Sequence, residues 1–440
     1  MEDRSLHGNI DAHRHAHRQR NEMLILAYIL FGLLALELHF LSSGVNIGNL
    51  IILSAVCIVG LLGSINRGLP FNLTYRFRTH DYIFLIYIAY TALTAFWSIS
   101  FGDTITGVVP VFGLFLLAIL ISKIDQSRLI RCTLMFAVVA AVLSLVMMVV
   151  VPDLAFQPKS STGQEELRGV FKHQLRLGAF MCVAAGFLVL AVLNGALKDV
   201  FFKRWTLRIL GIALIFLVLY LSRTRLYVAA AILSLVLTVG LSQKGGVRWL
   251  TFAVIAYGAL ILSQTYEDIL TYLEQIGFDT SLTARTLIWT RALAAITDQV
   301  YWLGFGYDSF INSHFDYLFR GNYRPSHAHN SFIQAHFETG MIGLLLLLLL
   351  VTVQFKAVLA ARRQKRNRYS YAMFLFFFNL FGSLIGLNYA GALSVMFGLF
   401  IICLAIETRP DPAAVLANGN AAGQSGHAGS AEASVAGRFA

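Results

Sequence analysis

Histidine and arginine residues in the second half of the chain have the types and spacing that polar transfer chemistry needs. His329 and Asn330 end a long polar segment, shortly before a leucine-rich run. A neutral imidazole can take a proton from a hydroxyl group, which makes His329 a candidate general base. Guanidinium groups pair bidentately with phosphate oxygens, so a cluster of arginines suits a phosphate-bearing partner. The alternative for His329 is an interfacial histidine that hydrogen-bonds a lipid headgroup.

The composition indicates which kind of fold positions these residues. The chain has 440 residues, 57% of them hydrophobic and only 13% charged, and its mean hydropathy is +0.69. Soluble domains carry roughly a quarter charged residues, so this chain lacks the polar surface that a water-soluble fold requires. The composition predicts an all-α integral membrane protein. It argues against a soluble enzyme, a secreted disulfide scaffold and a disordered chain.

Apolar runs of about 20 residues predict twelve membrane-spanning helices. They cover residues 23–41, 47–65, 82–98, 105–122, 129–151, 177–196, 207–222, 226–242, 249–265, 336–359, 371–387 and 390–406. The transmembrane domain is therefore expected at 23–406, after a basic tail at 1–22. The composition of residues 407–440, rich in Ala, Gly and Ser, predicts a disordered cytoplasmic tail. The phenylalanines at 376–378 are expected to face lipid.

The distribution of basic residues predicts the orientation of these spans. With both termini in the cytoplasm, 24 of the 34 Lys and Arg residues fall on the inside, and every inside loop has at least two. Such asymmetry is typical of inserted membrane proteins. The net charge of +11 therefore reflects topology, and no nucleic-acid partner is expected.

Ten basic residues fall on the outside, against this rule. They are Lys159, Arg168, Lys172, Arg176, Arg223, Arg225, Arg285, Arg291, Arg320 and Arg324. Cations that cost insertion energy are candidates for function. The alternative is that they extend to lipid headgroups, an interpretation that we favour for Arg320 and Arg324.

Two outside loops are long, at residues 152–176 and 266–335. The second begins with an amphipathic pattern, in which Arg285 and Trp289 lie on one predicted helical face. An indole at this place is expected to anchor the helix in the membrane interface while the neighbouring cation points into a site. Loops of this size usually carry function.

The end of the second loop predicts a further helix, which starts at Pro325 with Ser326 as its N-cap. Helical spacing places one row of residues on a common face, namely His329, Phe332, Ile333, His336, Gly340 and Gly343. The two glycines are expected to let a neighbouring helix pack closely. The helix dipole disfavours an imidazolium in the first turn, which would keep His329 neutral.

Three segments of the sequence carry a family resemblance. They are Leu221-Ser-Arg-Thr-Arg225, Arg285-x-x-x-Trp289 with Leu303-Gly-Phe-Gly306, and His329-Asn330 with Gly340 and Gly343. In this order, and beside twelve predicted spans, they resemble the bacterial O-antigen ligase and O-antigen polymerase superfamily. The resemblance covers roughly residues 165–360.

The resemblance implies a multi-spanning glycosyltransferase with a GT-C-like fold in the bacterial inner membrane. An O-antigen ligase moves O-polysaccharide from undecaprenyl pyrophosphate to lipid A–core at the periplasmic face. We expect this reaction to invert the anomeric centre and to need no metal and no other cofactor. The outside acidic residues include no Asp-x-Asp pair, which is the arrangement expected to hold a divalent ion on a pyrophosphate.

The resemblance also implies roles for individual residues. His329 is the expected catalytic base, and the pyrophosphate-binding residues are Arg223 and Arg285, supported by Arg225, Arg291 and Arg176. Supporting positions are Asn330, Lys172, His173, Trp289, Gly340 and Gly343.

Three other functions remain as alternatives to the ligase. A polymerase of the same superfamily moves a growing polymer onto one lipid-linked repeat, and a protein O-oligosaccharyltransferase uses a protein acceptor. A twelve-span transporter would also fit the predicted topology, but it predicts symmetry between two halves, whereas the unusual cations cluster in the second half. The long outside loop with its His-Asn helix, and a compact chain without a large C-terminal outside domain, favour the ligase.

Overall fold

The computed structural model describes most of the chain between Glu22 and Arg409. The described residues are 22–35, 38, 54–55, 75–158, 165–243, 245–246, 248–251, 253, 256–257, 282–310, 312–319, 325, 327–363, 369–386 and 394–409. The spans expected at 47–65 and 249–265 lie largely outside these residues. The count of twelve spans, the orientation and the domain boundaries therefore stay predictions.

The described chain is almost entirely helical. Its longer helices are Glu22–Ala35, α3 (Thr79–Leu93), α4 (Phe101–Ile121), α5 (Gln126–Val150), α7 (Gln174–Leu193), α9 (Trp205–Leu221), α10 (Arg225–Ser242), α12 (Leu282–Ala294), α13 (Ser331–Arg363), α14 (Tyr371–Ile385) and α15 (Val395–Glu407). Short helices are η2 (Thr94–Phe96), α6 (Pro152–Ala155), α8 (Leu197–Val200) and η3 (Ser313–Phe319). β1 (Phe156–Pro158) and β2 (Glu165–Leu167) form a small antiparallel hairpin.

The helices have the length and composition of a membrane protein. Among the described residues, α4, α5, α7, α10 and α13 are each long and apolar enough to cross a bilayer, and four further apolar helices are shorter. The prediction of an all-α, multi-pass membrane protein is confirmed at this level.

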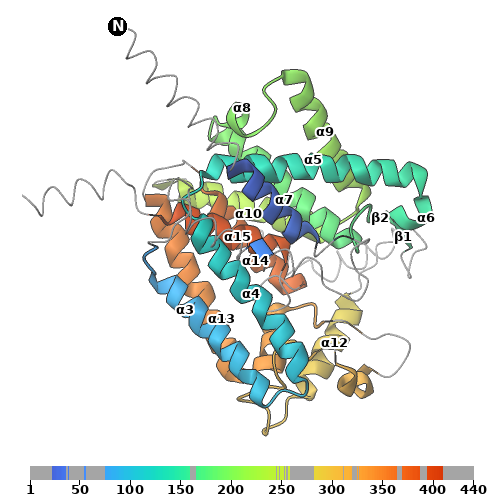
Figure 1. Ribbon diagram of the computed structural model, residues 1–440, viewed down its shortest axis with the longest axis vertical. Coiled ribbons are helices and arrows are strands. Elements are labelled where there is room, and N and C mark those ends of the chain that lie inside the picture. The colour runs from blue at the N-terminus through green and yellow to red at the C-terminus, as the bar shows by residue number, and fades with distance from the viewer. Residues whose placement is uncertain are drawn as a thin grey trace, which may run out of the picture.

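The helices form two groups that meet at the centre of the molecule. Figure 1 shows α3, α4 and α13 side by side, while α5 crosses them at a steep angle beside α7 and α9. Between the groups, α14 packs against α7, α10, α13 and α15. Phe376, Phe377 and Phe378 of α14 are buried, so the prediction that they face lipid is wrong. A helix that is apolar all round can be surrounded by protein as well as by lipid.

A break in α13 fixes how the outside loop meets the bundle. Gly340 has φ 67° and ψ −170°, so the helical path stops there and resumes at Met341. The segment Tyr301–Gly306 crosses α13 at this point. Its N–H groups at Phe305 and Gly306 bond to the carbonyls of Phe337 and Glu338, and the N–H of Met341 bonds to Tyr301. The predicted continuous face from His329 to Gly343 is therefore wrong.

The crossing requires a residue without a side chain at position 340. A Cβ on Gly340 would lie 2.3 Å from the backbone of Trp302, and its positive φ is strained for any other residue. We predict that Gly340→Ala lowers the stability of the purified protein by about 2 kcal/mol or more. Thermal unfolding in detergent measures this as a lower Tm.

Gly102→Ala is the matched control, because Gly102 lies in the first turn of α4 with nothing within 4 Å of its Cβ position. We expect this variant to keep or slightly raise the Tm, since alanine favours helices. Equal Tm values for the two variants would contradict the role of the crossing.

Candidate functional site

His329 lies in a short loop directly before α13 and not on the helix. The side-chain oxygen of Asn330 accepts the N–H groups of Phe332 (2.9 Å) and Ile333 (3.2 Å), which makes Asn330 the cap. The predicted start at Pro325 and Ser326 is therefore wrong. His329 has φ 53°, a left-handed conformation that an α-helix does not accept. Strain of this kind is often found at functional positions.

The loop that carries His329 is held through the peptide groups of Ala328. The indole N–H of Trp289 donates to the Ala328 carbonyl at 2.8 Å. The Ala328 N–H donates to Oε1 of Gln334 at 2.7 Å. Trp289 is thus bonded to the loop, and the expectation that it anchors α12 in the membrane interface stays a prediction. Bonds from two different helices restrict the positions that His329 can adopt.

Gln334 is itself held by a buried carboxyl group. Its Nε2 donates to Oε1 of Glu338 at 2.6 Å, and the same oxygen accepts the N–H of Phe310 at 3.3 Å. Gln334 and Glu338 are 3% and 1% exposed, so water does not compete for these bonds. The His329 loop, α13 and the outside segment near Phe310 are thereby joined in one hydrogen-bonded network.

Two further histidines are oriented by bonds to the backbone. Nδ1 of His327 accepts the N–H of His329 at 3.2 Å, and the two imidazole rings lie 4.1 Å apart between centroids. Nδ1 of His173 accepts the N–H of Leu175 at 3.1 Å and caps α7. A nitrogen that accepts carries no proton, so each neutral ring has its proton on Nε2. Both rings then present an N–H donor on Nε2.

Five basic side chains at and around His329 lie close enough together to affect the pKa values of the histidines among them. Burial lowers the pKa of His329 to about 4, with further contributions from Arg285, His173 and Arg176. Arg285 and Arg176 are cations, which disfavour a second positive charge on His329. His329 is therefore neutral at pH 7. The cause is burial together with neighbouring groups, and not the helix dipole that the sequence suggested. An imidazole in this state can accept a proton.

The same environment lowers the pKa values of the neighbouring His173 and His327. Burial lowers the pKa of His173 to about 4, followed by the effects of Arg176 and Arg168. Burial is the main cause that lowers the pKa of His327 to about 2. Smaller contributions come from His329, Arg176, His173 and Arg285. We call His173, Arg176, Arg285, His327 and His329 the basic cluster.

The remaining predicted arginines are placed around this cluster. Arg223 and Arg225 are exposed and flank Thr224 in the turn between α9 and α10. The buried Thr224 packs directly against Gly178 of α7. The turn is therefore attached near the end of α7 that carries Arg176. Arg223 and Arg225 are not among the groups that shift the pKa of His329.

Three other predicted positions have distinct surroundings. Lys172 is exposed, and Arg291 is half-buried in the last turn of α12. Gly343 faces α3, where the ring of Tyr90 would lie 3.1 Å from an added Cβ. The hydroxyl of Tyr90 donates to the Thr339 carbonyl at 2.9 Å. The predicted close helix packing therefore applies to Gly343, whereas Gly340 forms the break.

The sequence interpretation missed His327, Gln334 and Glu338. The spacing of Gln334 and Glu338 by four residues was a usable signal, since such residues meet on a helix. Among the described residues, no group of three or more His, Cys, Asp and Glu side chains is arranged to hold a metal ion.

Comparison with known families gives a match to part of the chain. Residues 209–348 match a family model described as O-antigen ligase. This segment is similar to the O-antigen ligase and polymerase superfamily, which supports the resemblance seen in the sequence. The match covers Arg223, Arg225, Arg285, Arg291 and His329, whereas His173 and Arg176 lie outside it.

One curated relative adds a second similarity. The chain is 30% identical over 163 residues to the exopolysaccharide production protein ExoQ of Rhizobium meliloti (strain 1021). The matched part is 35% of this chain and 32% of ExoQ, so the chain spans about a third of that relative. Members of the superfamily are glycosyltransferase-like enzymes, either ligases or polymerases.

The electrostatic coupling in the basic cluster predicts a measurable change of pKa. Removing a neighbouring cation restores the charged form of an imidazole, so Arg285→Gln should raise the pKa of His329. NMR titration of the histidine ring signals measures this shift, and the His329→Gln spectrum assigns the resonance. Arg291→Gln removes the same charge from the same helix and should leave the pKa of His329 unchanged. An unchanged titration in Arg285→Gln would contradict the coupling.

Proposed function

We propose that the protein transfers a glycan from a lipid pyrophosphate to an acceptor hydroxyl group at the basic cluster. The observation that carries this proposal is a neutral His329 held among cations. A neutral imidazole is suited to accept a proton from the acceptor, and the guanidinium groups are suited to the leaving pyrophosphate. The superfamily match supports the same reaction class.

The proposed reaction is a single displacement at the anomeric carbon. His329 removes the proton of the acceptor hydroxyl while its oxygen forms a bond to the anomeric carbon. The bond between that carbon and the pyrophosphate oxygen breaks, and its electron pair leaves with the lipid pyrophosphate. Attack from the face opposite the leaving group inverts the anomeric centre.

The arginines of the proposed site neutralise the charge that gathers on the leaving group. Arg176 and Arg285 stand in the basic cluster beside His329. We propose that Arg223 and Arg225, in the turn attached to α7, and Arg291 of α12 support them. The Nε2–H groups of His173 and His327 add two neutral donors. Guanidinium groups supply the positive charge that metal ions provide in other pyrophosphate sites, so we propose a metal-independent reaction.

We take lipid A–core as the acceptor, and undecaprenyl-pyrophosphate-linked O-polysaccharide as the donor, because the matching family is described as O-antigen ligase. The site would then face the periplasm from the inner membrane. A polymerase that extends a lipid-linked glycan is the second candidate. The similarity to ExoQ, an exopolysaccharide production protein, favours this candidate.

A complementation experiment tests the base and the acceptor together. In a strain that lacks its own copy of the gene, wild-type protein should restore the lipopolysaccharide ladder. His329→Ala should leave bare lipid A–core and let long lipid-linked polymer accumulate, since removal of a general base costs roughly 10²–10⁴-fold in rate. Gels of lipopolysaccharide and of the lipid-linked pool measure both effects.

His336→Ala is the matched control for this experiment. His336 is a half-buried histidine of α13, the helix that follows the His329 loop, and it packs edge-on to Tyr301 at 5.3 Å between ring centroids. We expect it to keep the ladder. Core capped with a single repeat in the His329 variant would establish the polymerase. A normal ladder in His329→Ala would refute the base assignment.

The arginines give a separate prediction in a purified system. Arg285→Gln should lower the transfer rate by roughly 10²–10³-fold, the usual cost of losing one charge-stabilising donor. Arg285→Lys keeps the charge but loses the planar fork, so it should fall between Arg285→Gln and wild type. A radiolabelled lipid-linked donor measures the rates. Full activity of Arg285→Gln would remove Arg285 from the site.

A further inference from the structure

A second group of basic side chains surrounds a cavity far from the basic cluster. The cavity has a volume of about 370 Å³, and Arg78, Thr79, His80, Lys356 and Thr408 supply its polar lining. Lys356 lies 25 residues beyond the start of α13, roughly 35 Å along the helix at 1.5 Å per residue. The cavity therefore lies at the opposite end of the bundle from His329.

The polar lining consists of groups that donate hydrogen bonds. Arg78 and Lys356 are cations, Thr79 and Thr408 carry hydroxyl groups, and His80 carries an imidazole. The remaining wall is made by small and apolar residues of α13 between Val353 and Ala361. No carboxylate of the described residues lines this cavity. An anion beside an apolar wall is the chemistry that such a lining fits.

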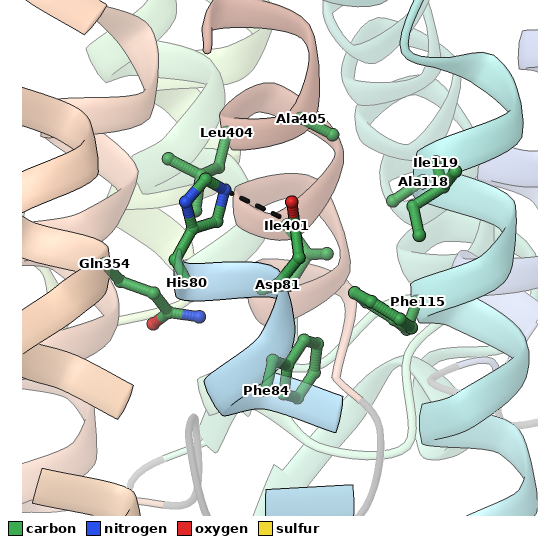
Figure 2. A pocket seen from close by; sticks show the side chains of 10 residues that line it. All are labelled: His80, Asp81, Phe84, Phe115, Ala118, Ile119, Gln354, Ile401, Leu404 and Ala405. Carbon is green, nitrogen blue, oxygen red and sulfur yellow. Dashed lines mark ion pairs between the residues drawn. The ribbon is translucent and has the colours of Figure 1, made fainter. Parts of the chain in front are cut away.

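Asp81 is a described carboxylate next to this cavity, and its oxygen atoms contact other groups. It is 5% exposed and lines a small neighbouring cavity of about 10 Å³ with His80 and Gln354. Its Oδ2 accepts the hydroxyl of Tyr75 at 3.0 Å and the backbone N–H of Arg78 at 2.9 Å. Figure 2 shows its other contact, with His80 Nε2, which lies 3.4 Å from Oδ1. The charges of Arg78 and Lys356 thus dominate the larger cavity.

One nitrogen atom of the lining is a buried donor without an acceptor. Nη1 of Arg78 makes no hydrogen bond with the described residues, whereas Nε2 of His80 has the 3.4 Å contact with Asp81. Buried donors in folded proteins almost always have a partner. The cavity also lies at the first turn of α3, where the helix dipole favours negative charge.

We propose that this cavity binds a phosphate group, carried by an anionic phospholipid or free in solution. The two cations, with the unbonded Nη1 of Arg78, would bind the phosphate oxygens, and the wall of α13 would contact an acyl chain. The distribution of basic residues predicts that this end faces the cytoplasm, where anionic lipids attract basic segments. The proposal is independent of the glycan-transfer reaction.

Thermal unfolding of the purified full-length protein tests the site with three probes. These are short-chain phosphatidylglycerol, short-chain phosphatidylcholine and inorganic phosphate. Phosphatidylglycerol should raise the Tm, and Arg78→Gln combined with Lys356→Gln should weaken its apparent affinity by about tenfold to thirtyfold. Lys123→Gln with Arg131→Gln is the control, because it removes two exposed cations of other segments. The control should respond as wild type does.

The outcomes separate the sources of the phosphate. A response to phosphatidylglycerol alone identifies a lipid headgroup, and an equal response to inorganic phosphate identifies the free ion. If the double variant misfolds, Lys356→Gln alone still tests the proposal, because Lys356 is exposed. This single variant should lose part of the affinity that the double variant loses. No response of wild type to either anion, or equal responses of wild type and the Lys356 variants, would overturn the proposal.

Discussion

The position of the candidate base depends on the hydrogen bonds that clamp the peptide groups of Ala328. Trp289 of α12 holds the carbonyl and Gln334 of α13 holds the N–H. The loop between them places His329 in a left-handed conformation, so the strain there is balanced by bonds on both sides. The crossing at Gly340 then fixes the outside segment against the same helix. Loss of either constraint would release the loop.

A half-buried cluster of basic residues costs free energy unless its charges are reduced or paired. The three histidines respond by becoming neutral, as their lowered pKa values indicate. The arginines of the cluster are suited to an anionic substrate. The same cations that help to keep His329 neutral would thus favour the binding of a pyrophosphate, which links the two halves of the proposed mechanism.

The sequence predicted the helical membrane fold. It also pointed to Arg176 and Arg285, because basic residues on the outside depart from the usual charge distribution of membrane proteins and are visible in the sequence. It misplaced the start of α13, since Ser326 and Asn330 are both good caps and only the backbone path distinguishes them. His327 was consequently missed as a neighbour of His329. The buried phenylalanines of α14 were assigned to lipid because hydrophobicity does not distinguish lipid from protein surroundings.

The pH dependence of kcat/KM for purified protein tests most directly whether a neutral His329 in a cationic environment acts as the base. This ratio reports the free enzyme. Because the pKa of His329 is lowered to about 4, the base stays neutral as the pH falls through 6.5. We predict constant kcat/KM between pH 7 and about pH 5.5, with loss near pH 4. A fall to half its value near pH 6.5, the ordinary pKa of histidine, would contradict the account.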